Sequence, residues 1–505
     1  MWTDVLYGLV SLFSDPVRIS IFLFGLFGGM IFGVIPGVSL LTLGAIILPF
    51  TAYLSSENAI MLFAVIYCSG VFGGAITAIL FNIPGSPENA PTTFDGYPMT
   101  QNGESGRAVG AAILCSSLGG VASVALMITA TPIIAKWAIT EFSVQEIFSL
   151  VVFGVCVAAS VGASSVLKGW ISVFIGLIIA TIGSDPTGGI DRFTFGSYYL
   201  MAGIHFIPVV LGLFAVSEVL DRVLTLSSGK DNPHKASMKL PSLLEFWMLK
   251  YAIIRSAIIG FFSGILPGIG SVLAAFLSYN EAVRWSRGKK YFGKGDIRGV
   301  VASETANNAA TGAAMIPLLA LGLPGGALTA MMLGVFNIHG IQTGPMVFLV
   351  SRDLVALTFA AMLMANILIF ALGWVQTKTV VNILKIPFQY LAPAIILLSV
   401  IGAFSVRNLL VDVWVMFLAA FLGFFLKKYG YSAAGLILGL VLGSIGESSF
   451  SKSMMLMQYN WLGFFERPWS AVLLTAALFT VVMGIVKWLK SEFFDDKREA
   501  HKIAQ

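Results

Sequence analysis

Long apolar runs, separated by short polar stretches, recur along the chain from residue 19 to residue 489. The runs are continuously apolar, which is typical of membrane-spanning helices, whereas the strands of a membrane barrel alternate between polar and apolar positions. Several runs are short or interrupted by proline and glycine. The pattern therefore predicts an all-α, polytopic membrane protein of about 12 spans, in which some helices are discontinuous or form re-entrant hairpins.

The composition supports a membrane protein. Only 11% of the 505 residues are charged and 57% are hydrophobic, whereas an ordinary soluble domain carries about 25% charged residues. This excludes a soluble enzyme, a disordered chain and a secreted disulfide scaffold. Cys68, Cys115 and Cys156 all lie in apolar stretches without metal-ligand spacing, so we expect small buried thiols.

Basic residues predict the organisation of the chain. They cluster between 221 and 299, on both sides of the apolar segment 251–280, which places both flanks of that segment in the cytoplasm. The segment must then either dip in and return or cross twice, and a re-entrant hairpin that turns at Pro267-Gly268 is the expected form. The predicted parts are an amphipathic N-terminal segment 1–18, a first transmembrane repeat half 19–220, a basic cytoplasmic linker 221–250, a second transmembrane repeat half 251–490 and a polar C-terminal tail 491–505.

Four Pro-Gly pairs indicate an internal repeat. Pro36-Gly37 and Pro267-Gly268 lie 231 residues apart, and Pro84-Gly85 and Pro324-Gly325 lie 240 apart. The first half carries little positive charge, since Arg18 is its only Lys or Arg before position 107. Matched segments with opposite charge bias predict a repeat of inverted topology.

A helix that breaks inside a membrane exposes backbone dipoles, and such unwound backbone is tolerated mainly where it lines a cavity. The ends of the two helix halves can attract an anion or a cation. We therefore expect a substrate and ion site near the midplane, with Na⁺ as a possible ligand of carbonyls near Gly37 and Gly268. The candidates are the four breaks and nearby polar side chains that hydrogen-bond an anion or ligate Na⁺: Pro36, Gly37, Ser39, Asn82, Pro84, Gly85, Ser86, Pro267, Gly268, Ser271, Asn307, Asn308, Pro324 and Gly325.

Plainer interpretations remain for these features. A single break can be a proline kink or a close-packing glycine. Residues 86–106 can be a solvated loop and 303–308 the polar start of a helix, which would explain Glu88, Asp95 and Glu304 without a binding role.

The missing motifs bear on function. The sequence contains no GxxxxGK[ST] phosphate loop and no HExxH, GxSxG or CxxC motif, and His205 is the only histidine well inside an apolar segment. We expect no enzyme and no cofactor, and an ion gradient as the energy source, with Na⁺ favoured over H⁺. A passive anion channel and a membrane-embedded lipid-modifying enzyme are the alternatives, and the latter would need a nucleophile and base at the interface.

Five stretches of the sequence resemble the large membrane subunit, of TctA type, of the tripartite tricarboxylate transporters. They are 33–37, 81–98, 264–270, 302–312 and 322–325. The resemblance implies a multi-pass protein of the bacterial inner membrane that imports di- or tricarboxylates by cation-coupled secondary transport. It also implies two partners, a small membrane subunit and a periplasmic solute-binding protein. An elevator-like movement follows only by analogy with other carboxylate carriers.

Overall fold

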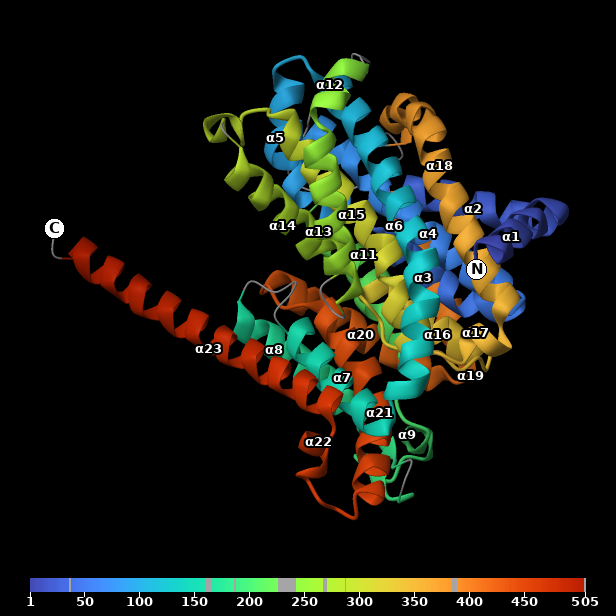
Figure 1. Ribbon diagram of the computed structural model, residues 1–505. Helices are drawn as coiled ribbons and strands as arrows, with labels where there is room; N and C mark the ends of the chain where they lie inside the picture. The colour runs from blue at the N-terminus through green and yellow to red at the C-terminus, as the bar shows by residue number, and fades with distance from the viewer. Residues whose placement is uncertain are drawn as a thin grey trace. The chain divides into compact units, whose positions relative to one another are not determined.

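The computed structural model describes residues 1–35, 38–159, 165–185, 188–225, 242–266, 270–286, 288–383 and 388–503 (Figure 1). These residues are almost entirely helical. The strands among them are β1 (Gly183–Ser184) and β2 (Asp191–Arg192), which pair antiparallel. The predicted breaks at Pro36-Gly37 and Pro267-Gly268 and most of the predicted linker lie outside the described residues.

Two compact units divide the chain, and each contains two segments. The first unit comprises Met1–Ala138 and Ile207–Phe424, and the second comprises Ile139–Phe206 and Phe425–Gln505. Helices α6 (Ser105–Glu141) and α20 (Leu410–Lys428) run from one unit into the other, and α10 (Phe206–Val210) begins at the boundary.

The elements of the first unit follow in chain order. They are α1 (Trp2–Ser14), α2 (Pro16–Val34), α3 (Leu40–Ile47), η1 (Leu48–Tyr53), α4 (Ser56–Phe81), η2 (Pro87–Asn89), α5 (Ala90–Gln101), most of α6, α10, η3 (Leu211–Val216), α11 (Ser217–Thr225), α12 (Leu243–Met248), α13 (Lys250–Ile265), α14 (Gly270–Trp285), η4 (Lys289–Tyr291), α15 (Ile297–Ala313), η5 (Pro317–Leu321), α16 (Ala327–Ile338), α17 (Val347–Val350), α18 (Arg352–Ile383), α19 (Phe388–Arg407) and most of α20. The second unit adds α7 (Val144–Ala158), α8 (Val166–Ala180), β1, β2, α9 (Tyr198–Met201), α21 (Ala433–Leu456), α22 (Gly463–Glu466) and α23 (Pro468–Ile503).

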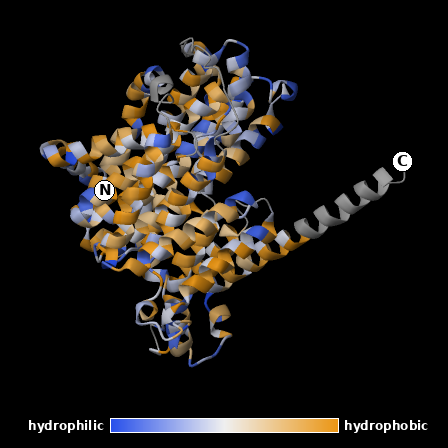
Figure 2. Ribbon diagram, turned by 180° about the vertical axis from the view of Figure 1, so that it is seen from behind, coloured by the Kyte–Doolittle hydropathy of each residue, from blue (hydrophilic) through white to orange (hydrophobic). Residues whose placement is uncertain are grey.

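The prediction of a polytopic helical membrane protein is confirmed. Among the described residues, 8 helices are long and apolar enough to cross a membrane, and shorter apolar helices accompany them. Hydrophobic residues lie along much of the length of the coloured helices (Figure 2). The long helices are α2, α4, α6, α18, α19, α20, α21 and α23. A count of about 12 spans requires shorter helices to cross as well, and it stays a prediction.

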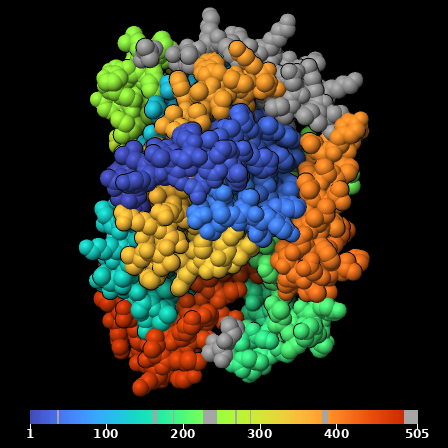
Figure 3. All heavy atoms as spheres, turned by 90° about the vertical axis from the view of Figure 1, so that its right-hand side faces the viewer, coloured from blue at the N-terminus to red at the C-terminus, as the bar shows by residue number. Residues whose placement is uncertain are grey.

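Helix α1 packs through one face. Val5, Gly8 and Leu12 are buried on that face, and a Cβ on Gly8 would collide with the carbonyl of Ala356 on α18. Figure 3 shows α1 and α2 in dark blue beside α18 in orange. Large apolar side chains on the rest of α1 stay exposed, among them Tyr7 at 75%, as expected of an amphipathic helix that faces lipid.

The crossing of α2 over α4 is repeated by the crossing of α13 over α15. A Cβ on Gly33 of α2 would lie 2.5 Å from the carbonyl oxygen of Gly70, and a Cβ on Gly264 of α13 would lie 2.6 Å from that of Ala310. Gly33 and Gly264 are 231 residues apart, and Gly70 and Ala310 are 240 apart. The offsets are those of the Pro-Gly pairs, so the sequence repeat is also a repeat of helix packing.

The two described breaks have the same backbone course. The helix before each break ends in a left-handed residue, Asn82 at φ 57° and Gly322 at φ 73°. The next N–H then reaches back six residues, from Ile83 to the Thr77 carbonyl and from Leu323 to that of Pro317. The chain doubles back so far that Gly85 lies against Gly74, and Gly325 against Ala314. A side chain larger than hydrogen on Gly85 would not fit this approach.

The contacts also show in which direction α5 runs relative to α4. Because Gly85 lies beside Gly74 and the Thr100 hydroxyl donates to the Ile79 carbonyl at 2.7 Å, α5 runs in the same direction as α4.

Along α15 the order is reversed. Asp95 meets Gly299 near the start of α15, Thr92 meets Glu304, and the Glu88 carbonyl meets Asn307 further on. Helix α15 is therefore antiparallel to α4, which is its counterpart in the other half. The predicted inverted repeat is present in the packing of the first unit.

Candidate functional site

The candidate site is built around one buried carboxylate, that of Glu304. Glu304, in the middle of α15, is fully buried. Its Oε1 accepts a hydrogen bond from the Thr92 hydroxyl at 2.5 Å and one from Asn89 Nδ2 at 3.3 Å, and its Oε2 accepts one from the Ser116 hydroxyl at 3.1 Å. Among the described residues, no Lys, Arg or His forms an ion pair with Glu304, so neutral groups alone surround this carboxylate.

Three elements deliver those neutral groups. Asn89 ends η2, Thr92 lies in the first turn of α5, and Ser116 is on α6. The backtracking of the chain after Asn82 carries η2 into the interior, where Asn89 Nδ2 also donates to the Val71 carbonyl at 3.0 Å. The break in α4 thus positions the partners of Glu304.

Two amides continue the cluster along α15. Asn307 Nδ2 donates to the Glu88 carbonyl at 3.5 Å, and Asn308 Nδ2 donates to Asn307 Oδ1 at 2.8 Å and to the Glu304 carbonyl at 3.2 Å. Both asparagines are fully buried, and Asn308 Oδ1 has no hydrogen-bond partner. A buried amide oxygen without a partner is costly, and a bound ion or ligand is one way to satisfy it.

Three further polar residues, Tyr67, Ser271 and Glu88, come from both halves of the sequence. Tyr67 on α4 interacts with Ser271 and with Glu88, and all three side chains are buried. Ser271 is the second residue of α14, next to the predicted Pro267-Gly268 turn. Tyr67 and Asn307 are 240 residues apart, so they are equivalent positions of the two halves.

The structure brings together some of the predicted site residues. Gly85, Ser86, Ser271, Asn307, Asn308, Pro324 and Gly325 are all buried, and the Ser86 hydroxyl donates to Asn89 Oδ1 at 2.6 Å. Gly325 lies near Gly270 at the start of α14.

Other predicted residues lie apart from this cluster. Asn82 and Pro84 are exposed, and Asn82 provides the left-handed turn that ends α4. Ser39 precedes α3, where its N–H donates to the Thr42 hydroxyl at 3.3 Å. Pro36, Gly37, Pro267 and Gly268 lie outside the described residues.

The interpretation of residues 86–106 as a solvated loop is wrong for the two acidic residues Glu88 and Asp95. Glu88 and Asp95 are buried, as is Glu304. Sequence reasoning also missed Tyr67, Asn89, Thr92 and Ser116 as members of the cluster. The spacing of positions 88, 92 and 95 is that of one helix face and signals an inward polar stripe on 86–98.

Asp95 fastens α5 to the loop that precedes α15. Its Oδ1 accepts backbone N–H groups of Gly293 (2.8 Å), Gly295 (3.0 Å) and Asp296 (2.9 Å), and its Oδ2 accepts the Tyr279 hydroxyl at 2.9 Å. Burial raises the pKa of the Asp95 carboxyl, and these donors oppose the shift without reversing it. Basic residues crowd this loop, which predicts that it is cytoplasmic.

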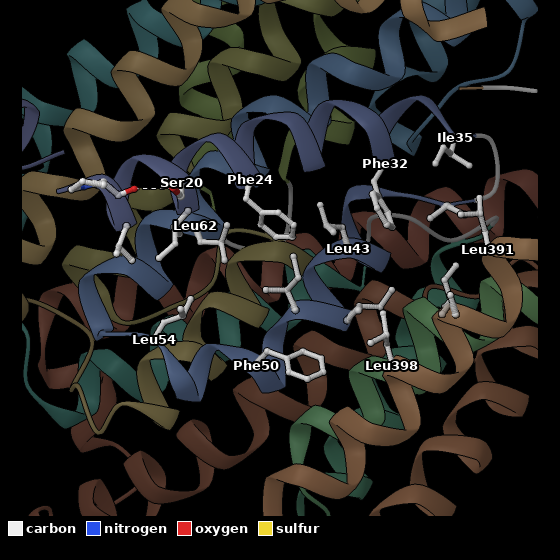
Figure 4. A pocket seen from close by; sticks show the side chains of 18 residues that line it. Ser20, Phe24, Phe32, Ile35, Leu43, Phe50, Leu54, Leu62, Leu391 and Leu398 are labelled. Carbon is white, nitrogen blue, oxygen red and sulfur yellow. Dashed lines mark hydrogen bonds between the residues drawn. The ribbon is translucent and has the colours of Figure 1, made fainter. Parts of the chain in front are cut away.

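An apolar cavity lies elsewhere in the first unit. It has a volume of about 850 Å³ and lies between α2, α3, η1 and α19 (Figure 4). Among the residues that line it, Ser20 is the one with a polar side chain. A carboxylate would lose its hydration there without gaining donors, so this cavity is not the candidate site. Cys68, Cys115 and Cys156 are buried, as expected.

Helix breaks in antiparallel repeats, with buried polar groups between them, are typical of membrane transporters. Residues 19–438 match the tripartite tricarboxylate transporter TctA family, and the chain belongs to that family. It is a multi-pass membrane protein of a transporter family.

Two relatives of the chain come from Agrobacterium vitis. The chain is 35% identical over 478 residues to an uncharacterized 52.8 kDa protein in the TAR-I ttuC' 3' region of Agrobacterium vitis, which covers 94% of this chain and 95% of the relative. It is also 35% identical over 229 residues to an uncharacterized protein in the TAR-II ttuC' 3' region of the same organism, covering 45% of this chain and 95% of the relative. No solved structure matches.

Proposed function

We propose that this chain is the large transmembrane subunit that imports organic di- or tricarboxylates across the bacterial inner membrane. Transport is secondary active and cation-coupled, with Na⁺ favoured over H⁺. A periplasmic solute-binding protein delivers the substrate, and a small membrane subunit completes the complex. Family membership supports the substrate class and the two partners. The coupling to Na⁺ and the location in the bacterial inner membrane are part of the proposal.

One observation carries the proposal for the site. Tyr67 of the first half interacts with Ser271 of the second half, and Asn307 of the second half donates to the carbonyl of Glu88 of the first, with all of these residues buried. Amide N–H and hydroxyl groups of this kind hydrogen-bond carboxylate oxygens without adding charge.

The buried acidic residues at this site explain why a coupling cation should bind together with the anionic substrate. Glu88 and Glu304 are both buried, and a substrate carboxylate that approached them alone would add negative charge where the dielectric is low. A cation that binds together with the substrate removes this repulsion. Coupling then follows from charge compensation.

The test is uptake of labelled citrate and other di- and tricarboxylates by the reconstituted three-component transporter, with Na⁺ and pH varied independently. We expect saturable uptake that requires the binding protein and a Na⁺ gradient, together with counterflow of unlabelled substrate. Uptake without counterflow or cation dependence would instead identify a passive anion channel.

A further inference from the structure

The binding site of the coupling ion can be assigned more closely. We infer that Glu304, Thr92 and Ser116 hold the Na⁺ ion of the transport cycle, an inference that rests on the proposed function. The three side chains come from α15, α5 and α6, and all three are buried. This site differs from the carbonyls near Gly37 and Gly268, which lie outside the described residues.

The donor set has the chemistry of a hard monovalent cation. It consists of one carboxylate and two hydroxyls, all oxygen ligands, which hard cations prefer over sulfur or imidazole. In the present geometry both hydroxyls donate to the carboxylate, Thr92 to Oε1 and Ser116 to Oε2. A hydroxyl also carries acceptor lone pairs and can rotate to present them to an ion. The same side chains can therefore hydrogen-bond to one another without the ion and ligate the ion when it binds.

The charge of the site matches one positive ion. The Glu304 carboxylate is fully buried and, among the described residues, forms no ion pair, so its charge is uncompensated by protein. A buried carboxylate without a counter-charge is strongly disfavoured. A divalent ion such as Ca²⁺ would need more carboxylates than the single one here, and the described residues contain no group of three His, Cys, Asp or Glu that could hold a metal ion.

Asn308 provides an independent sign of a ligand at this place. It lies four residues after Glu304, on the same face of α15, and its Nδ2 is fixed by the Glu304 carbonyl and by Asn307 Oδ1. Its Oδ1 is buried and has no partner. An unused amide oxygen one turn from a carboxylate with no counter-ion is a further oxygen for the ion.

The arrangement also links the ion to the substrate. Asn89 donates to Glu304 and accepts from Ser86, which belongs to the break that follows α4. Asn307 contacts both Asn308 and the Glu88 carbonyl. An ion at Glu304 therefore neutralises the charge next to the place where the anion binds and fixes the residues that contact it.

The first test measures binding without transport. The thermal unfolding midpoint of the purified full-length protein is followed in NaCl and in choline chloride at equal ionic strength, because an ion that binds only the folded state raises the midpoint. We expect Na⁺ to stabilise the wild type and the control Glu281→Gln, whose carboxylate pairs with Arg284 on α14. Glu304→Gln removes the charged ligand, and the Na⁺ concentration for half of the effect should rise about tenfold or more.

A second pair of variants separates ligation from folding. Thr92→Val removes the hydroxyl and keeps the shape, so it should weaken the response to Na⁺, and Thr92→Ser should restore it. Wild-type Na⁺ affinity in both Glu304→Gln and Thr92→Val would overturn the site. If the thermal unfolding midpoint of the wild type changes with pH but not with the Na⁺ concentration, the assignment to Na⁺ is wrong.

Uptake by the reconstituted transporter distinguishes failure of this site from failure of the proposed function. If wild-type uptake depends on Na⁺ and Glu304→Gln shows the same dependence, the site is wrong and the function stands. If wild-type uptake shows no cation dependence at all, the coupling in the proposed function is wrong.

Discussion

Glycine is required at the helix crossings because two backbones meet there. Gly33 on α2 faces the carbonyl oxygen of Gly70, and Gly264 on α13 faces that of Ala310. Neither carbonyl can move aside as the end of a flexible side chain would. Small residues at such crossings let membrane helices approach closely, and dispersion and weak hydrogen bonds then stabilise the pair.

Replacing Gly33 with alanine should lower the free energy of unfolding by about 2 kcal/mol, because the new methyl group forces α2 away from α4. Gly28→Ala on the same helix is the matched control, since its Cβ would meet only the end of the Leu43 side chain at 3.3 Å. Alanine should be neutral or slightly stabilising there, because it favours helix more than glycine does. Thermal unfolding in one detergent compares the two, and equal midpoints would refute the packing argument.

Asn307 and Asn308 are expected to matter for transport more than for folding. Leucine at either position keeps the volume but removes donors and acceptors from the buried cluster. Uptake of labelled carboxylate should fall to background while the protein still inserts in the membrane. The control Asn337→Leu changes an exposed residue of α16 and should transport normally. Normal uptake by both Asn307→Leu and Asn308→Leu would remove these residues from the site.

At the scale of elements, each described break is a backtracking turn and not a simple kink. The chain leaves α4 at Asn82, returns to Gly74, and continues along α4 in α5. This course places η2 and α5 between α4 and α15, where their polar side chains reach Glu304. Asp95 then fixes α5 to the loop before α15, so a segment of one half is anchored on the other.

Removing that anchor should loosen the loop. In Asp95→Ala, three backbone N–H groups and the Tyr279 hydroxyl lose their acceptor, and the loss should cost at least about 2 kcal/mol locally. Hydrogen exchange at Gly293, Gly295 and Asp296 should accelerate, whereas Asp353→Ala, an exposed change at the start of α18, should leave it unaltered. Unchanged exchange in Asp95→Ala would show that other contacts hold the loop.

The sequence predicted these elements in part, for physical reasons. Pro84-Gly85 and Pro324-Gly325 mark the breaks because proline and glycine act locally on the backbone. The direction of α5 depends on contact between Gly85 and Gly74, which no local pattern records. The stretch 86–98 looked like a loop because its polar side chains are usually solvated, and only the packed α15 opposite them shows that they are inside.

At the scale of the whole molecule, the two compact units do not coincide with the two halves of the sequence. The second unit takes 139–206 from the first half and 425–505 from the second. Hydropathy reports whether a segment enters a membrane but not which helices it packs against, so this division could not be read from the sequence. The inverted repeat in the first unit was predictable because its signals, the Pro-Gly pairs and the charge bias, are local.

The most direct test of the account is a density map of the complete transporter in a lipid bilayer, with Na⁺ and a bound carboxylate. We predict substrate density beside Asn307, Ser271 and Ser86, at the depth of the membrane midplane, with both described breaks within the bilayer. Substrate density far from these residues, or breaks that lie in water outside the bilayer, would contradict the account.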